Sequence, residues 1–207
     1  MDQEKMFQFM LKEYEMLYSK FEMHYKAVEK TIGLFFLIIG GLISANGFLL
    51  KDIKQFSLFS LSEFQTFCCF FIFIIGSIVL LKVIEHRLLI ITYVKNLNQN
   101  RKWFNNNSKG EIQLYSLFET TYKSPKYYKK FRHFYWEVLG MSILNNIFSA
   151  LFLINFVQKF GLKSKFAETL NWLFLLCIIG IGTLGFLIYY KLRAKKEEEN
   201  LGKKILN

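Results

Sequence analysis

A short stretch of the sequence combines cations with aromatic rings at a spacing suited to binding an anion. Residues 122–136 read YKSPKYYKKFRHFYW, and Ser124 followed by Pro125 favours a helix start. The serine hydroxyl can cap free amides, and proline at the first helical position has no amide to leave unpaired. On the helix that follows, cations and aromatic rings fall on opposite faces. We expect the basic face to bind phosphate through Lys126, Lys129, Lys130 and Arg132.

Two kinds of anion fit this pattern, and the residues alone do not separate them. A helix with rings on one face and lysines on the other is typical of a membrane interface with anionic lipid. The same pattern suits a soluble nucleotide or a single-stranded oligonucleotide, whose bases stack on aromatic rings. A second group of basic and aromatic residues consists of Arg101, Lys102 and Trp103. If this group binds the ligand together with the first, the soluble ligand is favoured.

A stripe of polar side chains lies within a long uncharged segment, where such residues are rare. Ser142, Asn145 and Ser149 share one helical face, and Asn146 lies beside it. A polar stripe inside a membrane either forms hydrogen bonds with a neighbouring helix or lines water. If several copies surround an axis, the three residues become candidates for a pore lining. Glycines in the first and fourth windows mark faces where helix backbones can approach closely. They are Gly33, Gly40, Gly41, Gly47, Gly180, Gly182 and Gly185.

The sequence lacks the motifs and spacings of residues that enzymes and metal sites require. His24, His86 and His133 have no histidine, cysteine or carboxylate at a metal-binding spacing. The chain has no glycine-rich phosphate loop and no nucleophile elbow. Glu85 with His86 and Arg87 is the nearest approach to a reactive cluster, and an interfacial charge pair explains it. We therefore expect no catalysis, no metal and no cofactor.

Four long windows without Asp, Glu, Lys or Arg position these side chains. A helix of about 20 residues crosses a bilayer core of roughly 30 Å, and each window has about 18 residues or more. A chain of 207 residues with 53% hydrophobic residues has too little polar surface to cover four such helices in water. The sequence thus predicts an all-α integral membrane protein with windows at Thr31–Leu50, Phe64–Leu81, Val138–Gln158 and Thr169–Tyr190.

The distribution of cations predicts how these spans are oriented. The chain carries a net charge of +11, and 22 of its 27 Lys and Arg residues lie in segments on one side of the four spans. Because Lys and Arg stay on the cytoplasmic side, both termini and the central segment are predicted to be cytoplasmic. The predicted segments are a cytoplasmic helix 1–30, span 31–50, outer loop 51–63, span 64–84, cytoplasmic basic and aromatic region 85–137, span 138–158, outer loop 159–168, span 169–190 and cytoplasmic tail 191–207.

Helical periodicity continues beyond two of the spans. A heptad seam precedes the first span, so one helix is expected to run from the cytoplasm into the membrane. The seam packs either on the chain's own helices or, as we favour, on other copies. The second span continues through residues 82–97, whereas the Asn-rich NQNRKWFNNNSKG predicts a turn, and residues 111–121 a short helix. The seam residues are Phe7, Leu11, Tyr14, Tyr18, Phe21, Tyr25 and Val28.

The layout seen in EKMFQFMLKEYEMLYSKFEMHYKAVEKTIGLFFLIIGGLISANG and LLKVIEHRLLIITYV resembles small bacterial membrane effectors of anti-phage defence. These include the two-span SLATT type and the four-span effector of the Hailong system. The resemblance covers about the first hundred residues and assigns no site residue. It implies a homo-oligomeric ion channel in the bacterial inner membrane that depolarises an infected cell. Its ligand would be a nucleotide or oligonucleotide made by a partner nucleotidyltransferase.

Two functions remain open from the sequence. The first is an ion channel controlled by an anionic ligand, in which the basic helices act as the sensor. The alternative is a membrane scaffold that does not conduct: it recruits a cytoplasmic partner through the N-terminal seam and binds anionic lipid. In both cases the lipid bilayer is a partner.

Overall fold

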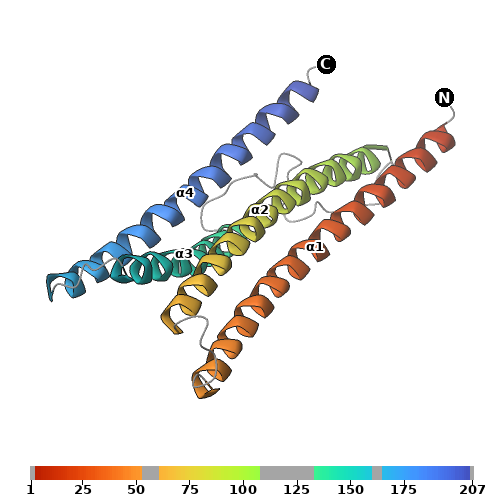
Figure 1. Cartoon of the computed structure of the whole chain (residues 1–207). Helices are drawn as coiled ribbons and strands as arrows, with labels where there is room; N and C mark the ends of the chain where they lie inside the picture. The colour runs from red at the N-terminus through yellow and green to blue at the C-terminus, as the bar shows by residue number, and fades with distance from the viewer. Residues whose placement is uncertain (1–2, 53–60, 108–132, 160–164, 206–207) are drawn as a thin grey trace. The chain divides into compact units, whose positions relative to one another are not determined.

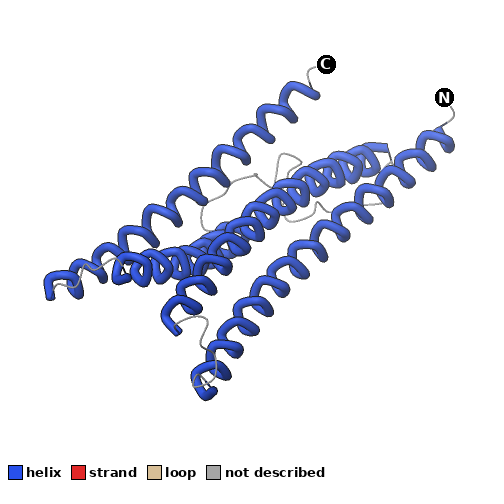
Figure 2. Tube along the Cα trace, in the orientation of Figure 1, coloured by secondary structure: helices blue, strands red, loops and turns tan. Residues whose placement is uncertain are grey.

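Four helices make up the part of the chain that the computed structural model describes, which comprises residues 3–52, 61–107, 133–159 and 165–205 (Figure 1). No strand occurs among these residues (Figure 2). The helices are α1 (Gln3–Asp52), α2 (Leu61–Asn107), α3 (His133–Lys159) and α4 (Lys165–Ile205). All four are long and apolar enough to cross a membrane, which confirms a helical protein with four candidate spans.

The first helix is much longer than a bilayer is thick. It contains 50 residues without a break, so at 1.5 Å per residue it measures about 75 Å. A hydrocarbon core of roughly 30 Å covers less than half of this length. The predicted continuity from the N-terminal seam into the first span is confirmed, and a large part of α1 must lie outside the hydrocarbon.

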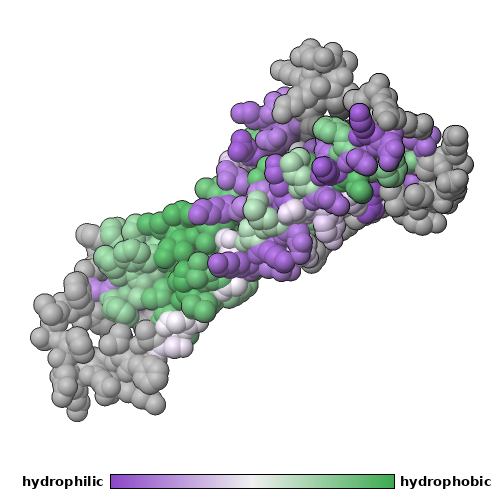
Figure 3. Space-filling view, turned by 90° about the vertical axis from the view of Figure 1, so that its right-hand side faces the viewer, coloured by the Kyte–Doolittle hydropathy of each residue, from purple (hydrophilic) through white to green (hydrophobic). Residues whose placement is uncertain are grey.

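The chain divides into two compact units, which we describe separately. The charged unit comprises Met1–Lys30, Ile84–Lys130 and Arg193–Asn207. The apolar unit comprises Thr31–Val83 and Phe131–Leu192. Figure 3 shows hydrophilic and hydrophobic residues gathered in separate regions of the face that it draws. The division follows composition, because the apolar unit contains the four uncharged windows.

In the charged unit, α2 supplies most of the core. Its fully buried side chains include Ile90, Val94 and Leu97. From α1, Val28 is fully buried and Leu17 nearly so, and α4 contributes Ala194. α1 and α2 run antiparallel in this unit: the ring of Phe7 contacts that of Phe104 edge to face, with centroids 5.1 Å apart, and Tyr25 lies near Arg87. In the charged unit, α1 and α2 thus form an antiparallel pair of helices, and Ala194 of α4 is buried in the same unit.

The turn predicted from the Asn-rich segment is wrong for residues 98–107, because α2 continues as a helix to Asn107. Asn100 is 8% exposed and Phe104 is 6% exposed, so two residues four positions apart pack on one face of the helix. Asparagine disfavours helix by only about 0.7 kcal/mol per residue, which burial of neighbouring apolar side chains outweighs. The predicted helix at 111–121 and the start at Ser124 and Pro125 lie outside the described residues.

In the apolar unit, α2 and α3 are more enclosed than α4. Val138 and Ala150 of α3 and Leu80 of α2 are fully buried, and Phe35 of α1 packs among them. By contrast, only 11% of the apolar window of α4 is buried, against 39% for α2. Ile181 on α4 is 72% exposed. Exposed apolar side chains on a spanning helix suit contact with lipid or with another helix.

Candidate anion site and the buried polar cluster of the spans

Four of the predicted anion-binding cations, Lys126, Lys129, Lys130 and Arg132, lie outside the described residues. The second group, Arg101, Lys102 and Trp103, lies in the last turns of α2. Whether the two groups come together thus stays a prediction.

Arg101 is held by α1 in the charged unit. Its Nε and Nη2 donate hydrogen bonds of 3.1 and 2.6 Å to the hydroxyl of Tyr14. The guanidinium carbon also lies 5.5 Å from the centre of the same ring. Trp103 contacts the edge of Phe104 with centroids 5.3 Å apart, whereas Lys102 is exposed. Arg101 therefore joins two helices, and a phosphate would compete with a phenol for it.

The predicted pore residues are enclosed within the chain. Ser142 and Asn145 are 0% exposed and Ser149 is 9% exposed. The amide of Asn145 donates a 3.0 Å hydrogen bond to the hydroxyl of Ser77 on α2. Of the two roles that the sequence left open, these contacts correspond to hydrogen bonding with a neighbouring helix. The pore assignment stays a prediction.

The next residue, Asn146, makes the corresponding contact on the other side. Its amide donates to the hydroxyl of Thr183 on α4 at 3.4 Å, and to the carbonyl of Ser142 within α3 at 2.8 Å. Two consecutive asparagines, Asn145 and Asn146, thus connect α3 to α2 and to α4. In a low-dielectric interior each such hydrogen bond also avoids the cost of an unpaired amide.

Each asparagine side chain also occupies space that a glycine leaves open. A Cβ at Gly76 of α2 would overlap the Oδ1 of Asn145, and one at Gly182 of α4 would overlap the side-chain amide of Asn146. The buried Oδ1 of Asn145 accepts no hydrogen bond from the described residues. We expected close packing at Gly182 and missed Gly76. Gly76, Ser77 and Thr183 were not predicted as partners, because each is a single small or polar residue in an otherwise apolar window.

The predicted cluster of Glu85, His86 and Arg87 links α2 to its neighbours in the charged unit. Glu85 pairs with Arg193 of α4 at 3.7 Å, and both side chains are partly exposed. The guanidinium of Arg87, which is 3% exposed, lies 5.6 Å from the centre of the Tyr25 ring on α1. Glu85 therefore takes part in an ion pair, as expected, but its partner Arg193 lies outside the predicted cluster.

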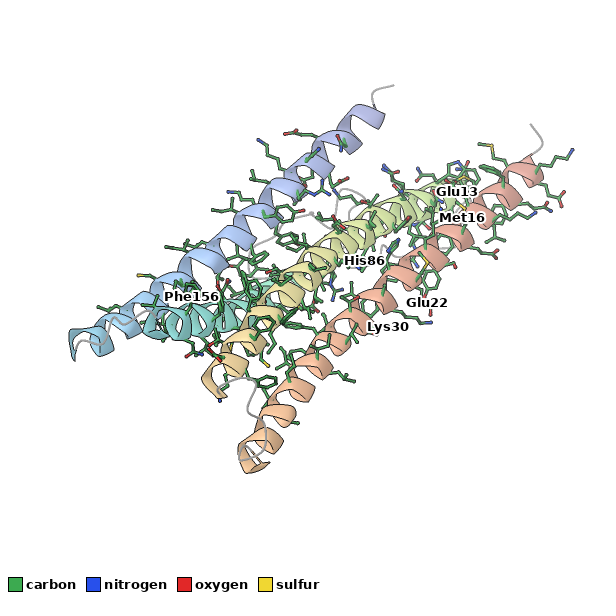
Figure 4. The ribbon with its side chains drawn as sticks, in the orientation of Figure 1. Glu13, Met16, Glu22, Lys30, His86 and Phe156 are labelled. Carbon is green, nitrogen blue, oxygen red and sulfur yellow. The ribbon has the colours of Figure 1, made fainter. Side chains whose placement is uncertain are left out.

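A pair of histidines joins α1 to α2 at the same level. The Nδ1 atoms of His24 and His86 are 2.9 Å apart, and the ring of His24 stacks on Tyr93 with centroids 5.4 Å apart. Figure 4 shows His86 on the side of α2 that faces α1. One Nδ1 must donate and the other accept, so the contact requires at least one neutral ring. Burial, together with the neighbouring His86, lowers the pKa of His24 below 6.5.

Within the described residues, no group of three or more His, Cys, Asp or Glu could hold a metal ion. No protein-family model matches the chain, and no curated protein or solved structure is similar to it.

The glycine contacts predict unequal effects of two similar substitutions. Gly182→Ala should displace the Asn146 amide and weaken the helix packing by about 1 kcal/mol relative to Gly180→Ala. Gly180 is a matched control, because it lies on the same helix and a Cβ there would meet nothing within 4 Å. Both changes raise helix propensity equally. Denaturation of the purified protein in mixed micelles measures the difference, and equal stabilities would contradict the assigned contact.

The histidine pair predicts that acid weakens the packing of α1 on α2. Since the pKa of His24 is lowered in the folded protein, the unfolded chain binds a proton first. The stabilisation should be complete above about pH 6.5 and decline as the pH falls through the lower, folded value. Hydrogen exchange of residues 14–28 between pH 7.5 and 5.5 measures this. In His24→Gln the pH dependence should flatten; an unchanged slope would show that another group is responsible.

Proposed function

We propose that the protein is a homo-oligomeric membrane effector that conducts ions under the control of an anionic ligand. In this proposal both termini and the segment between α2 and α3 lie in the cytoplasm, and the spans cross a bacterial inner membrane. The layout resembles that of anti-phage membrane effectors, which supports a role in defence with a ligand from a partner nucleotidyltransferase. No enzymatic activity belongs to the proposal.

The observation that carries the proposal is the apolar surface of α1 outside the membrane. Phe9, Met16 and Tyr18 are 63%, 49% and 45% exposed in the single chain. They lie among charged residues in the half of α1 that a bilayer core cannot cover. Apolar side chains repeated along an extramembrane helix indicate a protein interface. This surface supports assembly, on which an axial pore depends.

The internal bonds of the third span suggest what could differ between closed and open states. In the proposal, Ser142, Asn145 and Ser149 bond within the chain when the channel is closed and face water when it is open. Asn145 now donates to the hydroxyl of Ser77 and lies against Gly76 of α2, and the hydroxyl of Ser142 accepts from the Asn146 amide at 3.3 Å. Hydrogen bonds of this kind contribute only about 0.6–2 kcal/mol each in membranes, so a ligand of ordinary affinity can offset their loss.

The ligand acts through Arg101 in this proposal. A phosphate forms charge-assisted hydrogen bonds with a guanidinium, which are about twice as strong as those to a neutral hydroxyl. A phosphate that binds Arg101 therefore draws it away from Tyr14 and loosens α1 from α2. Lys102 and Trp103 lie beside it, and the proposal adds Lys126, Lys129, Lys130 and Arg132 from the following segment.

One observation favours the alternative function of a scaffold that does not conduct. The amides of Asn145 and Asn146 on α3 donate hydrogen bonds within one chain, to Ser77, to the carbonyl of Ser142 and to Thr183. In this second proposal the exposed residues of α1 recruit a cytoplasmic partner, and the basic residues bind anionic lipid. Reconstitution separates the functions: the channel gives ion flux from liposomes that changes with added nucleotide or oligonucleotide, whereas the scaffold gives none.

Removal of the predicted sensor charges tests the anion site. Changing Lys126, Lys129, Lys130 and Arg132 together to Gln should lower nucleotide or oligonucleotide affinity more than about 100-fold, since each charge-assisted hydrogen bond contributes about 1.5–3 kcal/mol. The matched control is Lys195, Lys196, Lys203 and Lys204 to Gln, which removes the same charge from the C-terminal tail. Binding is measured at several salt concentrations. Equal losses in both variants, or impaired membrane insertion without a ligand effect, would favour lipid binding instead.

Competition at Arg101 predicts a gain of affinity from a conservative change. Tyr14→Phe removes the hydroxyl that accepts the two hydrogen bonds but keeps the ring. Nucleotide or oligonucleotide affinity should rise about 5- to 10-fold, the equivalent of one ordinary hydrogen bond. Tyr18→Phe serves as the control, because Tyr18 is exposed on the same helix. If Tyr14→Phe leaves affinity unchanged while Arg101→Gln lowers it, Tyr14 does not compete with the ligand.

A further inference from the structure

Two separate apolar rows run along the part of α1 in the charged unit. The first row is Leu11, Tyr18 and Tyr25, which are 44%, 45% and 38% exposed. The second row is Phe9, Met16 and Met23, which are 63%, 49% and 57% exposed. Residues seven apart lie nearly on one line of a helix, so each row is continuous. At about 100° per residue, the two rows lie roughly 160° apart around α1.

Among the described residues, contacts within the chain leave the side chains of both rows at least 38% exposed, although Tyr25 also lies near Arg87 of α2. The side of α1 that packs on α2 carries Tyr14, His24 and the nearly buried Leu17. This side lies between the two rows, so each row borders the contact between α1 and α2. Neither row can enter lipid along its whole length, since charged residues accompany it at every turn. Figure 4 shows Met16 and the charged Glu22 on this part of α1.

Each row is bordered by charges of one sign on the outer side of the helix. Next to the first row is an acidic column, and next to the second row is a basic column. Both columns are exposed, and the ion pair of Glu22 with Lys26 at 2.7 Å joins them within the helix. Exposed pairs of this kind contribute only a few tenths of a kcal/mol and can exchange partners. The acidic column is Glu15, Glu22 and Glu29, and the basic column is Lys5, Lys12 and Lys26.

We propose that the first row and acidic column of one copy pack against the second row and basic column of the next copy. The inference rests on the homo-oligomer of the proposed function. All copies enter the membrane in one orientation, so their α1 helices are parallel and the seven-residue periods of the two sides match. Apolar row then meets apolar row, with glutamates beside lysines.

The arrangement of the two sides determines the symmetry. Since each copy offers two different surfaces on nearly opposite sides of α1, the contact is heterologous, and each copy has two neighbours. The copies form a closed ring if the repeated rotation from each copy to the next leads back to the first copy. A two-fold contact through either row alone would instead leave the glutamates of one copy without the lysines of the other beside them. Charge complementarity between the two sides of the same helix is what identifies a second copy, rather than another protein, as the occupant.

Charge exchange tests the pairing. Glu15, Glu22 and Glu29 to Lys, or Lys5, Lys12 and Lys26 to Glu, should each lower the assembled fraction more than tenfold. The six-residue exchange in one chain should restore it, because complementarity returns with the signs reversed. Native mass spectrometry in lipid nanodiscs counts the copies, and circular dichroism and membrane insertion check that each variant folds. Single exchanges that still assemble, or a six-residue exchange that does not, would overturn the pairing.

Mixing two row variants tests the heterologous contact. Leu11, Tyr18 and Tyr25 to Gln removes the first row, and Phe9, Met16 and Met23 to Gln removes the second. Each variant alone should be monomeric, whereas the mixture should give one-to-one dimers and nothing larger, because one intact pair of sides remains. Mixtures without dimers would overturn the heterologous contact. If the wild-type protein assembles and both variants assemble equally, only the ring contact fails; a monomeric wild-type protein removes the proposed function as well.

Discussion

The length of α1 relative to the bilayer is the constraint from which the other features follow. A continuous helix of 50 residues cannot be covered by hydrocarbon along its length, so its charged half must be stable in water or against protein. That half packs one side on α2, through contacts such as Arg101 with Tyr14 and His24 with His86. Its other apolar residues remain exposed. We propose that assembly of several copies covers them.

The two units satisfy their polar groups in different ways, and each way suits its surroundings. In the apolar unit, Asn145 and Asn146 reach hydroxyl groups across the helix interfaces, and Gly76 and Gly182 leave space for their oxygens. In the charged unit, aromatic rings and cations share contacts, as Arg87 does with Tyr25. Contacts between aromatic rings and cations can be exchanged for contacts with a charged ligand, whereas the enclosed amides of the spans can exchange only with water or another helix. This difference is why the proposal assigns sensing to one unit and conduction to the other.

Much of the fold could be predicted from the sequence because uncharged length is a strong signal in a membrane. The four spans were predicted in this way, whereas the continuous α1 was predicted from the heptad seam that precedes the first span. The seam was predicted in part: Tyr14, Phe21 and Val28 face inward or are half-buried, but Tyr18 and Tyr25 are exposed and Leu17 is buried instead. Apolar residues surround most of α1, so periodicity alone does not select the packed side. The partners of Asn145 and Asn146 depend on the register between helices, which a single sequence does not encode locally.

The most direct test of the account is electron cryomicroscopy of the protein in a lipid nanodisc. The account predicts a closed ring in which the charged halves of neighbouring α1 helices touch outside the membrane, with Met16 of one copy near Tyr18 of the next. A single copy whose α1 rows face solvent would contradict it. So would an assembly held together by the spans alone, with the charged halves of α1 apart.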